Sequence, residues 1–175
     1  AVANKRAAYD NWRALFATYR AQYPKEARQL ANPQLSVTGV ATTRKPGEKV
    51  ATRQASAEVL QTVAGANPQF WGGAADLASS NKTLDGGGTF GKDTPAGKNI
   101  FFGVREFGMA AAVNGINLHG GTRAFGSTFL VFTDYLRAAI RQAALMHLPS
   151  IFIGTHDSIA VGEDGPTHQP VEQLA

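Results

Sequence analysis

Aromatic and aliphatic side chains recur at helical spacing in the first 22 residues of the chain. Five of them stand three or four positions apart: Tyr9, Trp12, Leu15, Phe16 and Tyr19. Charged residues occupy positions between them, so the pattern predicts an amphipathic helix that ends before Pro24. We expect residues 1–31 to form a helical arm whose aromatic stripe packs onto this domain or onto a neighbouring one.

The next segment, residues 32–49, has the composition of a linker. It is rich in Pro, Gly, Ser and Thr, which favour turns and extended chain. From residue 50 onward, short apolar runs alternate with longer helical patterns. The predicted strands cover residues 70–74, 100–104, 124–128 and 150–154, and the predicted helices cover residues 51–64, 106–119 and 130–146.

This alternation is typical of βαβ units, in which right-handed crossovers join parallel strands. We therefore predict an α/β fold for residues 50–175, with a doubly wound, mainly parallel sheet and helices on both faces. Ligands of such folds bind at the carboxyl ends of the strands, which here precede residues 76–82, 105–106, 128–135 and 155–168. These segments contain no Gly-x-Gly-x-x-Gly or Walker motif, so nucleotide binding through those motifs has no support.

Composition narrows the class of protein. The chain has 175 residues, of which 43% are hydrophobic and 17% are charged, as in one well-buried globular domain rather than a disordered chain. It has no cysteine, which excludes disulfides, zinc–thiolate sites and a cysteine nucleophile. No apolar run is long enough to cross a membrane and no signal segment opens the chain, so we expect a cytoplasmic protein.

The net charge of +4 comes from the N-terminal part of the chain. Residues 1–53 hold ten Lys/Arg and three Asp/Glu, whereas residues 54–175 hold seven and ten. The basic residues of the arm are spread along a helix and are not interleaved with exposed aromatic side chains. A solvated helix face accounts for them better than nucleic-acid binding does.

Three features near the predicted strand ends have both a structural and a functional interpretation. Glu106 begins a largely apolar helix, where the helix dipole alone favours an acid. Phe129, Phe132 and Tyr135 stand at steps of three, so we expect them along one flank of a helix, where core packing is their ordinary role. The loop over residues 155–169 concentrates two of the four histidines and several acids, and it is either a surface loop or part of a site.

Taken together, these segments resemble one family. The segments that carry the resemblance are Gly72–Asn81, Phe102–Met109, Ser127–Tyr135, Thr155–Ile159 and Gly162–Gln173. From about residue 49 onward, the chain is similar to the pyrimidine-binding domain of transketolase, a thiamine diphosphate enzyme. The last two segments are the most specific, because His156 separates transketolase-like sequences from the related deoxyxylulose phosphate synthases.

The resemblance implies a thiamine diphosphate-binding fold and gives cofactor roles to individual residues. Glu106 matches a catalytic glutamate that hydrogen-bonds a ring nitrogen of the cofactor's aminopyrimidine and so promotes formation of the reactive carbanion. Asp76 matches a further contact to the cofactor. Phe129, Phe132 and Tyr135 match the aromatic residues around the pyrimidine, with Phe132 stacking on the ring.

The resemblance also implies contacts to a substrate. Arg53, Ser80 and His156 match the groups that hold the terminal phosphate of a sugar phosphate. Asp164 and His168 match contacts to the sugar hydroxyls and to the reacting end of the donor ketose, and His168 is expected to be catalytic through proton transfer. The implied activity moves a two-carbon ketol unit from a ketose phosphate to an aldose phosphate in the pentose phosphate pathway.

Other parts of the implied enzyme are expected outside this chain. In the family, the cofactor's diphosphate and its Mg²⁺ or Ca²⁺ bind to a separate domain, so we expect no metal site here. The implied partner is the diphosphate-binding domain of a second subunit in a homodimer, or of a split partner chain. We expect neither nucleic acid nor a membrane as a partner. We expect the domain over residues 50–175 to be incomplete at its C-terminus and inactive alone. The alternative is a non-catalytic assembly or interaction domain of the same fold.

Overall fold

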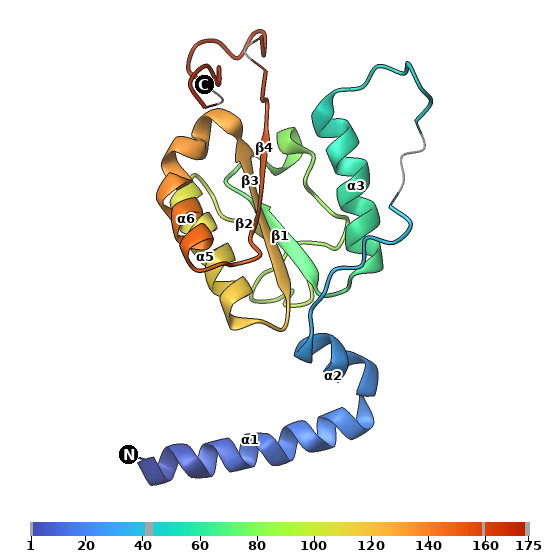
Figure 1. The fold of residues 1–175 in the computed structure, drawn as a ribbon, viewed down its shortest axis with the longest axis vertical. Helices are drawn as coiled ribbons and strands as arrows, with labels where there is room; N and C mark the ends of the chain where they lie inside the picture. Colours follow the sequence, from blue (N-terminus) through green and yellow to red (C-terminus); the bar gives the residue numbers. More distant parts are fainter. Residues whose placement is uncertain (1, 41–43, 159, 174–175) are drawn as a thin grey trace.

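Four parallel strands form the centre of the molecule. The computed structural model describes residues 2–40, 44–158 and 160–173. The strands are β1 (Phe70–Ala74), β2 (Asn99–Phe101), β3 (Arg123–Phe129) and β4 (Ile151–Thr155), in the order β2-β1-β3-β4 (Figure 1). Every neighbouring pair of these strands is parallel. The predicted parallel sheet is therefore confirmed.

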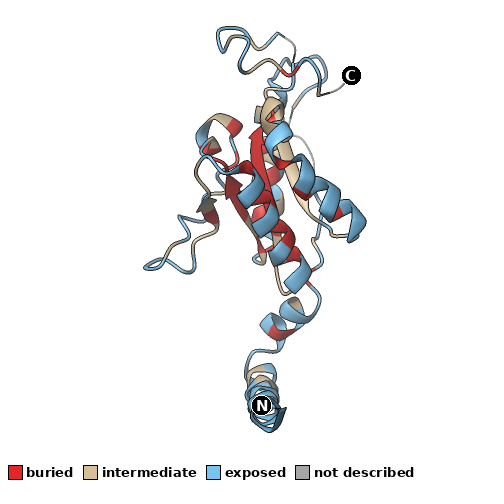
Figure 2. Ribbon diagram, turned by 90° about the vertical axis from the view of Figure 1, so that its left-hand side faces the viewer, coloured by how far each residue is buried: buried red, intermediate tan, exposed pale blue. Residues whose placement is uncertain are grey.

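Helices cover both faces of this sheet, as predicted. Helix α3 (Thr52–Ala66) lies on one face, whereas α5 (Glu106–His119) and α6 (Thr133–Leu145) pack against each other on the opposite face (Figure 1). The two central strands, β1 and β3, are largely buried, the edge strands β2 and β4 are less so, and the outer sides of the helices are exposed (Figure 2). Two short helical segments, α4 (Ala78–Asn81) and η1 (Leu130–Phe132), follow β1 and β3.

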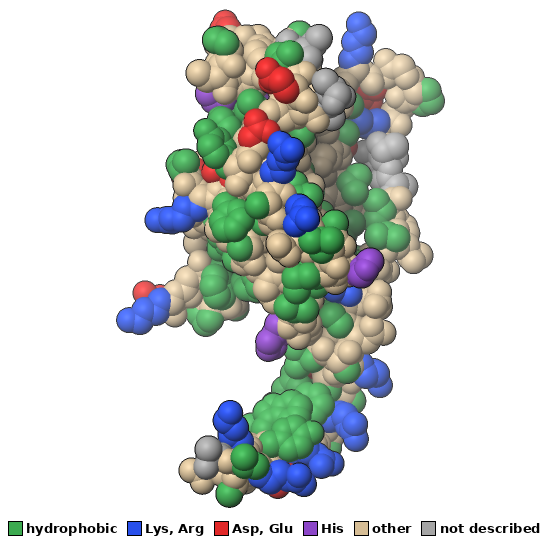
Figure 3. Space-filling model, turned by 60° about the vertical axis from the view of Figure 1, so that its left-hand side comes forward, with side chains coloured by type: hydrophobic (Ala, Val, Ile, Leu, Met, Phe, Trp, Pro, Cys, Tyr) green, Lys and Arg blue, Asp and Glu red, His purple; other side chains and the backbone are tan. Residues whose placement is uncertain are grey.

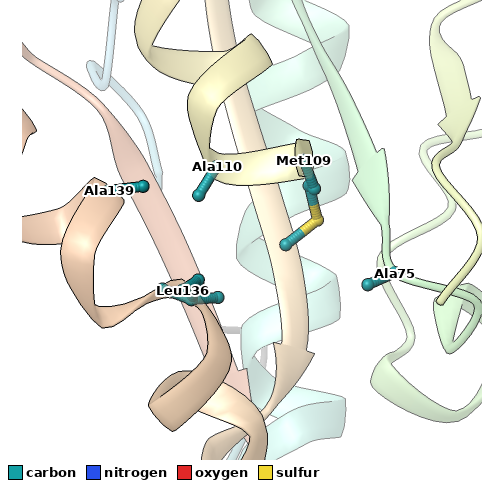
Figure 4. Packing of buried hydrophobic residues seen from close by; sticks show 5 residues of the cluster. All are labelled: Ala75, Met109, Ala110, Leu136 and Ala139. Carbon is teal, nitrogen blue, oxygen red and sulfur yellow. The ribbon is translucent and has the colours of Figure 1, made fainter. Parts of the chain in front are cut away.

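Each face of the sheet has its own hydrophobic core. The core under α5 and α6 consists of Ala75, Met109, Ala110, Leu136 and Ala139 (Figure 4), and Phe102 and Phe152 pack against it. The core under α3 consists of Leu60, Ala64, Phe70 and Phe125, bordered by Leu35, Val63, Ile151 and Ile153. Burial from both sides is the reason that parallel strands of this kind appear in the sequence as short apolar runs.

A glycine lets α5 approach β3 closely. Gly126 follows Phe125 on β3, so the two residues face opposite sides of the sheet. A Cβ atom on Gly126 would lie 3.2 Å from the side chain of Met109, which is fully buried. Met109 therefore fills the space that a larger residue at position 126 would occupy. Because Glu106 lies about one turn before Met109, this contact also helps to fix Glu106 at the edge of the sheet.

The N-terminal arm consists of two helices, α1 (Val2–Gln22) and α2 (Pro24–Ala31). Helix α1 has no buried residue and extends away from the sheet (Figure 1). Four aromatic rings stack along it with neighbouring centroids 5.4–6.2 Å apart: Tyr9, Trp12, Phe16 and Tyr19. They form a hydrophobic strip flanked by Lys and Arg (Figure 3). The helix is amphipathic as predicted, but its aromatic stripe does not pack onto this domain. The expectation that the basic residues are not interleaved with exposed aromatic side chains was wrong, since Tyr9 and Trp12 are exposed and Arg13 lies 5.9 Å from the ring of Tyr9.

Length alone does not make α1 a membrane helix. It has 21 residues, but Lys, Arg and Asp side chains interrupt its apolar positions. Within the described ranges of the chain, no helix combines the length and the hydrophobicity that a membrane crossing requires.

The linker, residues 32–49, is fastened to the sheet domain, although residues 41–43 lie outside the described part. The Asn67 side chain, which is 2% exposed, accepts a hydrogen bond from Ser36 N at 2.7 Å and donates one to Ser36 O at 2.9 Å. Arg44 donates hydrogen bonds to the carboxylates of both Glu48 and Glu58. These contacts give an irregular segment a defined path along α3.

Substitution of Leu136, which is 1% exposed, tests the packing of the core under α5 and α6. Leu136→Ala should lower the free energy of unfolding by about 2–5 kcal/mol, because it deletes buried methyl groups and leaves a cavity. Leu145→Ala, on the same helix but at a position 58% exposed, should change it by no more than about 0.5 kcal/mol. Urea unfolding measures both changes, and equal losses would contradict the packing described above.

Candidate functional site

The carboxyl ends of the four strands meet at one edge of the sheet, and the strand order reverses there. From β1 the chain moves outward to β2, then crosses to β3 and β4 on the other side of β1. At such a reversal the segments after the two central strands separate and leave a crevice for a ligand. Two cavities lie at this edge. Every predicted site residue lines one of them or contacts a residue that does.

The first cavity, here called the aromatic pocket, has a volume of about 440 Å³. Its lining comes from the segments that follow β1, β2 and β3: Ala75, Asp76, Leu77, Val104, Glu106, Phe132 and Tyr135. Two carboxylates, those of Asp76 and Glu106, therefore face a cavity with mainly hydrophobic walls. Four of the five residues predicted to bind the cofactor line this one pocket.

Glu106 is the buried acid of the aromatic pocket. It is the first residue of α5 and is only 8% exposed. Within residues 2–40, 44–158 and 160–173, no group hydrogen-bonds or ion-pairs with its carboxylate, whose oxygens are accessible rather than enclosed by protein atoms. A buried carboxylate that lines a cavity without a protein partner is suited to bind a hydrogen-bonding group of a ligand.

Phe129, Phe132 and Tyr135 do not lie along one helix, so that prediction was wrong. Phe129 ends β3, Phe132 lies in η1 and Tyr135 lies in the first turn of α6. A 3₁₀ turn has three residues per turn, so side chains three positions apart still follow one another. The ring centroids are 6.0 Å apart for Phe129 and Phe132 and 6.2 Å apart for Phe132 and Tyr135. Phe129, 6% exposed, lies outside the lining of the aromatic pocket.

The second cavity, here called the polar pocket, lies between the start of α3 and the segment after β4. It has a volume of about 410 Å³, and its lining includes Arg53, His156, Asp157 and Asp164. The Nη1 atom of Arg53 lies 2.7 Å from Nε2 of His156 and 3.4 Å from the backbone oxygen of Ser80. The three residues predicted to hold one phosphate therefore meet, although they are far apart in the sequence.

Aromatic contacts join the two pockets. The ring of Phe129 stacks on that of His156, with centroids 3.6 Å apart. His168 meets the rings of Phe129 and Phe132 edge-on, at 5.8 and 5.4 Å between centroids. His168 thus lies where residues of the polar pocket and of the aromatic pocket meet.

Two of the predicted site residues have a left-handed backbone. The φ angle is 66° at Asp76, just after β1, and 54° at His156, just after β4. Few non-glycine residues adopt this conformation, although Asp and His do so more often than most. It costs about 1–3 kcal/mol per residue and is concentrated at functional sites. Asp76 lies where the chain leaves the central strand β1, and His156 lies where it leaves the edge strand β4.

The pKa of His156 is lowered from its ordinary value of 6.5. Burial is the largest cause, because it disfavours the charged ring, and the Arg53 guanidinium lowers the pKa further. Asp164 and Asp157 oppose this shift, whereas His168 adds to it. The ring of His156 is therefore neutral at neutral pH.

Some pocket residues were not found from the sequence. Leu77 and Val104 line the aromatic pocket, and Thr52 and Asp157 line the polar pocket, where Thr52 Oγ1 donates to Asp157 Oδ1 at 3.3 Å. Leu77 and Asp157 fall within the segments predicted to bind ligands, residues 76–82 and 155–168. Val104 ends a predicted strand and Thr52 lies near the start of a predicted helix, and nothing else in the sequence singles these residues out. No group of three or more acidic or histidine side chains suited to a metal ion occurs among the described residues.

The sequence matches a known family over most of its length. Residues 48–175 match the family described as "Transketolase, pyrimidine binding domain", and the chain belongs to this family. It is 55% identical to a transketolase of Halalkalibacterium halodurans and 53% identical to one of Bacillus subtilis, over 95% and 94% of this chain. Each match covers 26% of the relative, so the chain spans about a quarter of the length of these curated relatives.

Solved structures agree with the sequence match. The fold is similar to that of a transketolase from Leishmania mexicana, with a TM-score of 0.86 and 40% identity over 97% of this chain and 26% of that one. A Pichia stipitis transketolase in complex with sedoheptulose-7-phosphate gives a TM-score of 0.86 and 37% identity, over 99% of this chain and 28% of that one. The family resemblance predicted from the sequence is confirmed.

An NMR titration of His156 in this chain tests the charge balance of the polar pocket. We expect the pKa of His156 to lie below 6.5 in the wild-type chain. Arg53→Ala should raise this pKa because a neighbouring cation is lost, whereas Arg141→Ala, on the exposed side of α6, should leave it unchanged. Because protonation then favours the unfolded chain, stability should fall as the pH drops from about 6.5 toward the folded-state pKa. A wild-type pKa of 6.5 or more, or no response to Arg53→Ala, would contradict this balance.

Proposed function

We propose that this chain is the pyrimidine-binding segment of a transketolase, which transfers a two-carbon ketol unit from a ketose phosphate to an aldose phosphate. The observation that carries the proposal is Glu106. Its carboxylate is 8% exposed, lines a mainly hydrophobic cavity, and has no partner within the described residues. Membership of the pyrimidine-binding family supports the same function.

The residues of the aromatic pocket fit the aminopyrimidine part of thiamine diphosphate. A flat heteroaromatic ring needs an aromatic face to stack on and polar groups for its nitrogens. Phe132 and Tyr135 offer the faces, and Glu106 and Asp76 offer the carboxylates. The chemistry that thiamine diphosphate supplies when bound is a carbon nucleophile able to break and form the carbon–carbon bond of a ketose.

The residues of this pocket then have distinct tasks. Glu106 holds a proton at a ring nitrogen of the aminopyrimidine, which its buried carboxylate can share at short range. Phe132 and Tyr135 orient the ring and exclude water from the reacting carbon. Asp76 provides a second polar contact to the cofactor, from the turn after β1.

The polar pocket binds the sugar phosphate. Arg53 and His156 line this pocket, and Arg53 also contacts the backbone oxygen of Ser80. A guanidinium is the preferred partner of a phosphate because it can donate two parallel hydrogen bonds. Asp164 accepts hydrogen bonds from sugar hydroxyls. His168, between the two pockets, moves a proton at the reacting end of the substrate.

Further parts of the proposal concern the complete protein. The diphosphate of the cofactor and a Mg²⁺ or Ca²⁺ ion would be held outside this chain, by a domain of a second subunit or of a partner chain. The complete enzyme would be a homodimer in the cytoplasm and act in the pentose phosphate pathway. The coverage of the curated relatives supports placing these groups outside this chain, since the chain matches 26% of the length of each.

A chimera provides the direct test of the proposal. In it, this chain replaces the matching quarter of the full-length transketolase from Halalkalibacterium halodurans, with which it is 55% identical. The proposal predicts that the chimera binds thiamine diphosphate and transfers ketol units between sugar phosphates. A folded, dimeric chimera without transfer activity would favour the non-catalytic assembly role instead.

Glu106→Gln in this chimera tests the role of the buried carboxylate. Glutamine keeps the shape of the side chain but cannot share a proton, so exchange of the C2 proton of bound cofactor should slow by about 10²- to 10⁴-fold. Glu26→Gln, at an exposed position of α2, is the matched control and should leave exchange unchanged. NMR at saturating cofactor measures the rate. Exchange in Glu106→Gln within tenfold of the unsubstituted chimera would mean that Glu106 is only a helix-terminal acid.

A further inference from the structure

Behind the polar pocket lies a buried row of hydroxyl and amide side chains. Its members come from three segments, the end of α4, β3 and β4, and each is almost fully buried: Asn81 (1% exposed), Thr83 (2%), Ser127 (0%) and Thr155 (4%). Thr155 Oγ1 donates to Asn81 Oδ1 at 2.5 Å, and Asn81 Nδ2 donates to Ser127 Oγ at 3.2 Å. Ser127 Oγ in turn lies 2.8 Å from Thr83 Oγ1. Such a fully partnered network is rigid, because each lost bond would leave a buried polar group unsatisfied.

The hydrogen bonds of this row have defined directions where it meets His156. A guanidinium only donates, so Nε2 of His156, 2.7 Å from Arg53 Nη1, must be the unprotonated nitrogen. The proton of the neutral ring is then on Nδ1. Thr155 Oγ1, 3.0 Å from Nδ1, can accept it because its own hydrogen is donated to Asn81.

We infer that Thr155 and Asn81 are positioning residues, which hold His156 in the Nδ1–H tautomer so that Nε2 can orient Arg53. The inference rests on the proposed function of the polar pocket as a phosphate site. It adds two residues that do not themselves line the polar pocket. Thr155 and Asn81 act through His156, and His156 acts on the arginine.

We expect these hydrogen bonds to matter because they orient the guanidinium of Arg53. Both contacts of the guanidinium, to His156 Nε2 and to the Ser80 backbone oxygen, use Nη1. No partner of Nη2 or Nε occurs among the described residues. These two nitrogens form the edge of the guanidinium that binds two oxygens of a phosphate at once. His156 in the other tautomer would present an N–H group to Nη1 and would turn Arg53 away.

The tautomer can be measured in this chain without any catalytic assay. Nitrogen-15 NMR distinguishes protonated from unprotonated ring nitrogens, and a His156→Gln variant identifies the signals among the four histidines. In the wild-type chain, we expect the proton of His156 on Nδ1. Thr155→Val, which removes the hydroxyl at nearly constant shape, should weaken this preference because only the contact to Arg53 then favours it, whereas Thr155→Ser should retain it. A wild-type ring protonated on Nε2 would overturn the inference even if Thr155→Val failed to fold.

Kinetics of the chimera described above provide the second measurement. Thr155→Val should raise the KM for a phosphorylated ketose about two- to tenfold, the value of one hydrogen bond, with little effect on kcat. The KM for hydroxypyruvate, which has no phosphate, should not change, and Thr155→Ser should restore the wild-type value. Equal effects on both donors would overturn the positioning role. An unsubstituted chimera without transfer activity would contradict the proposed function instead, and the NMR result would still decide the tautomer.

Discussion

The reversal of strand order between β1 and β3 is the constraint on which the rest of the molecule depends. All four strands are parallel, so their carboxyl ends point to one edge, and each following segment begins there. Asp76 follows β1, Glu106 follows β2, Phe132 follows β3 and His156 follows β4. These residues are far apart in the sequence, and only the sheet brings them together.

The two pockets at this edge differ in chemistry and are linked by aromatic contacts. The aromatic pocket has hydrophobic faces and a buried carboxylate, whereas the polar pocket has a guanidinium, a neutral imidazole and carboxylates. Phe129 lies between them, stacked on His156 on one side and near Phe132 on the other. His168 contacts the same aromatic rings, so a change at Phe129 would affect both pockets. This arrangement suits a reaction between a bound flat ring and a bound sugar phosphate.

Much of the fold could be predicted because local patterns determine it. The helix over residues 106–119 and the strand over residues 70–74 have the predicted bounds, since in both cases a largely apolar run lies between segments of polar residues and glycine. The one-turn helix α4 and the 3₁₀ turn at residues 130–132 were missed, because segments this short have no periodicity. The predicted helix over residues 130–146 therefore began three residues too early. The buried row around Asn81 was also missed, because it depends on contacts between distant segments that no local pattern reports.

The proposed assignment of the aromatic pocket to the cofactor ring and of the polar pocket to a phosphate is tested most directly through Arg53. In the chimera, Arg53→Ala should raise the KM for phosphorylated sugars about ten- to a hundredfold, because a charge-assisted hydrogen bond is lost. The reaction of hydroxypyruvate with an unphosphorylated acceptor should barely change, and Arg141→Ala should affect neither reaction. If Arg53→Ala impaired both reactions equally, Arg53 would be a structural residue at the start of α3, and the assignment of the polar pocket to phosphate would be wrong.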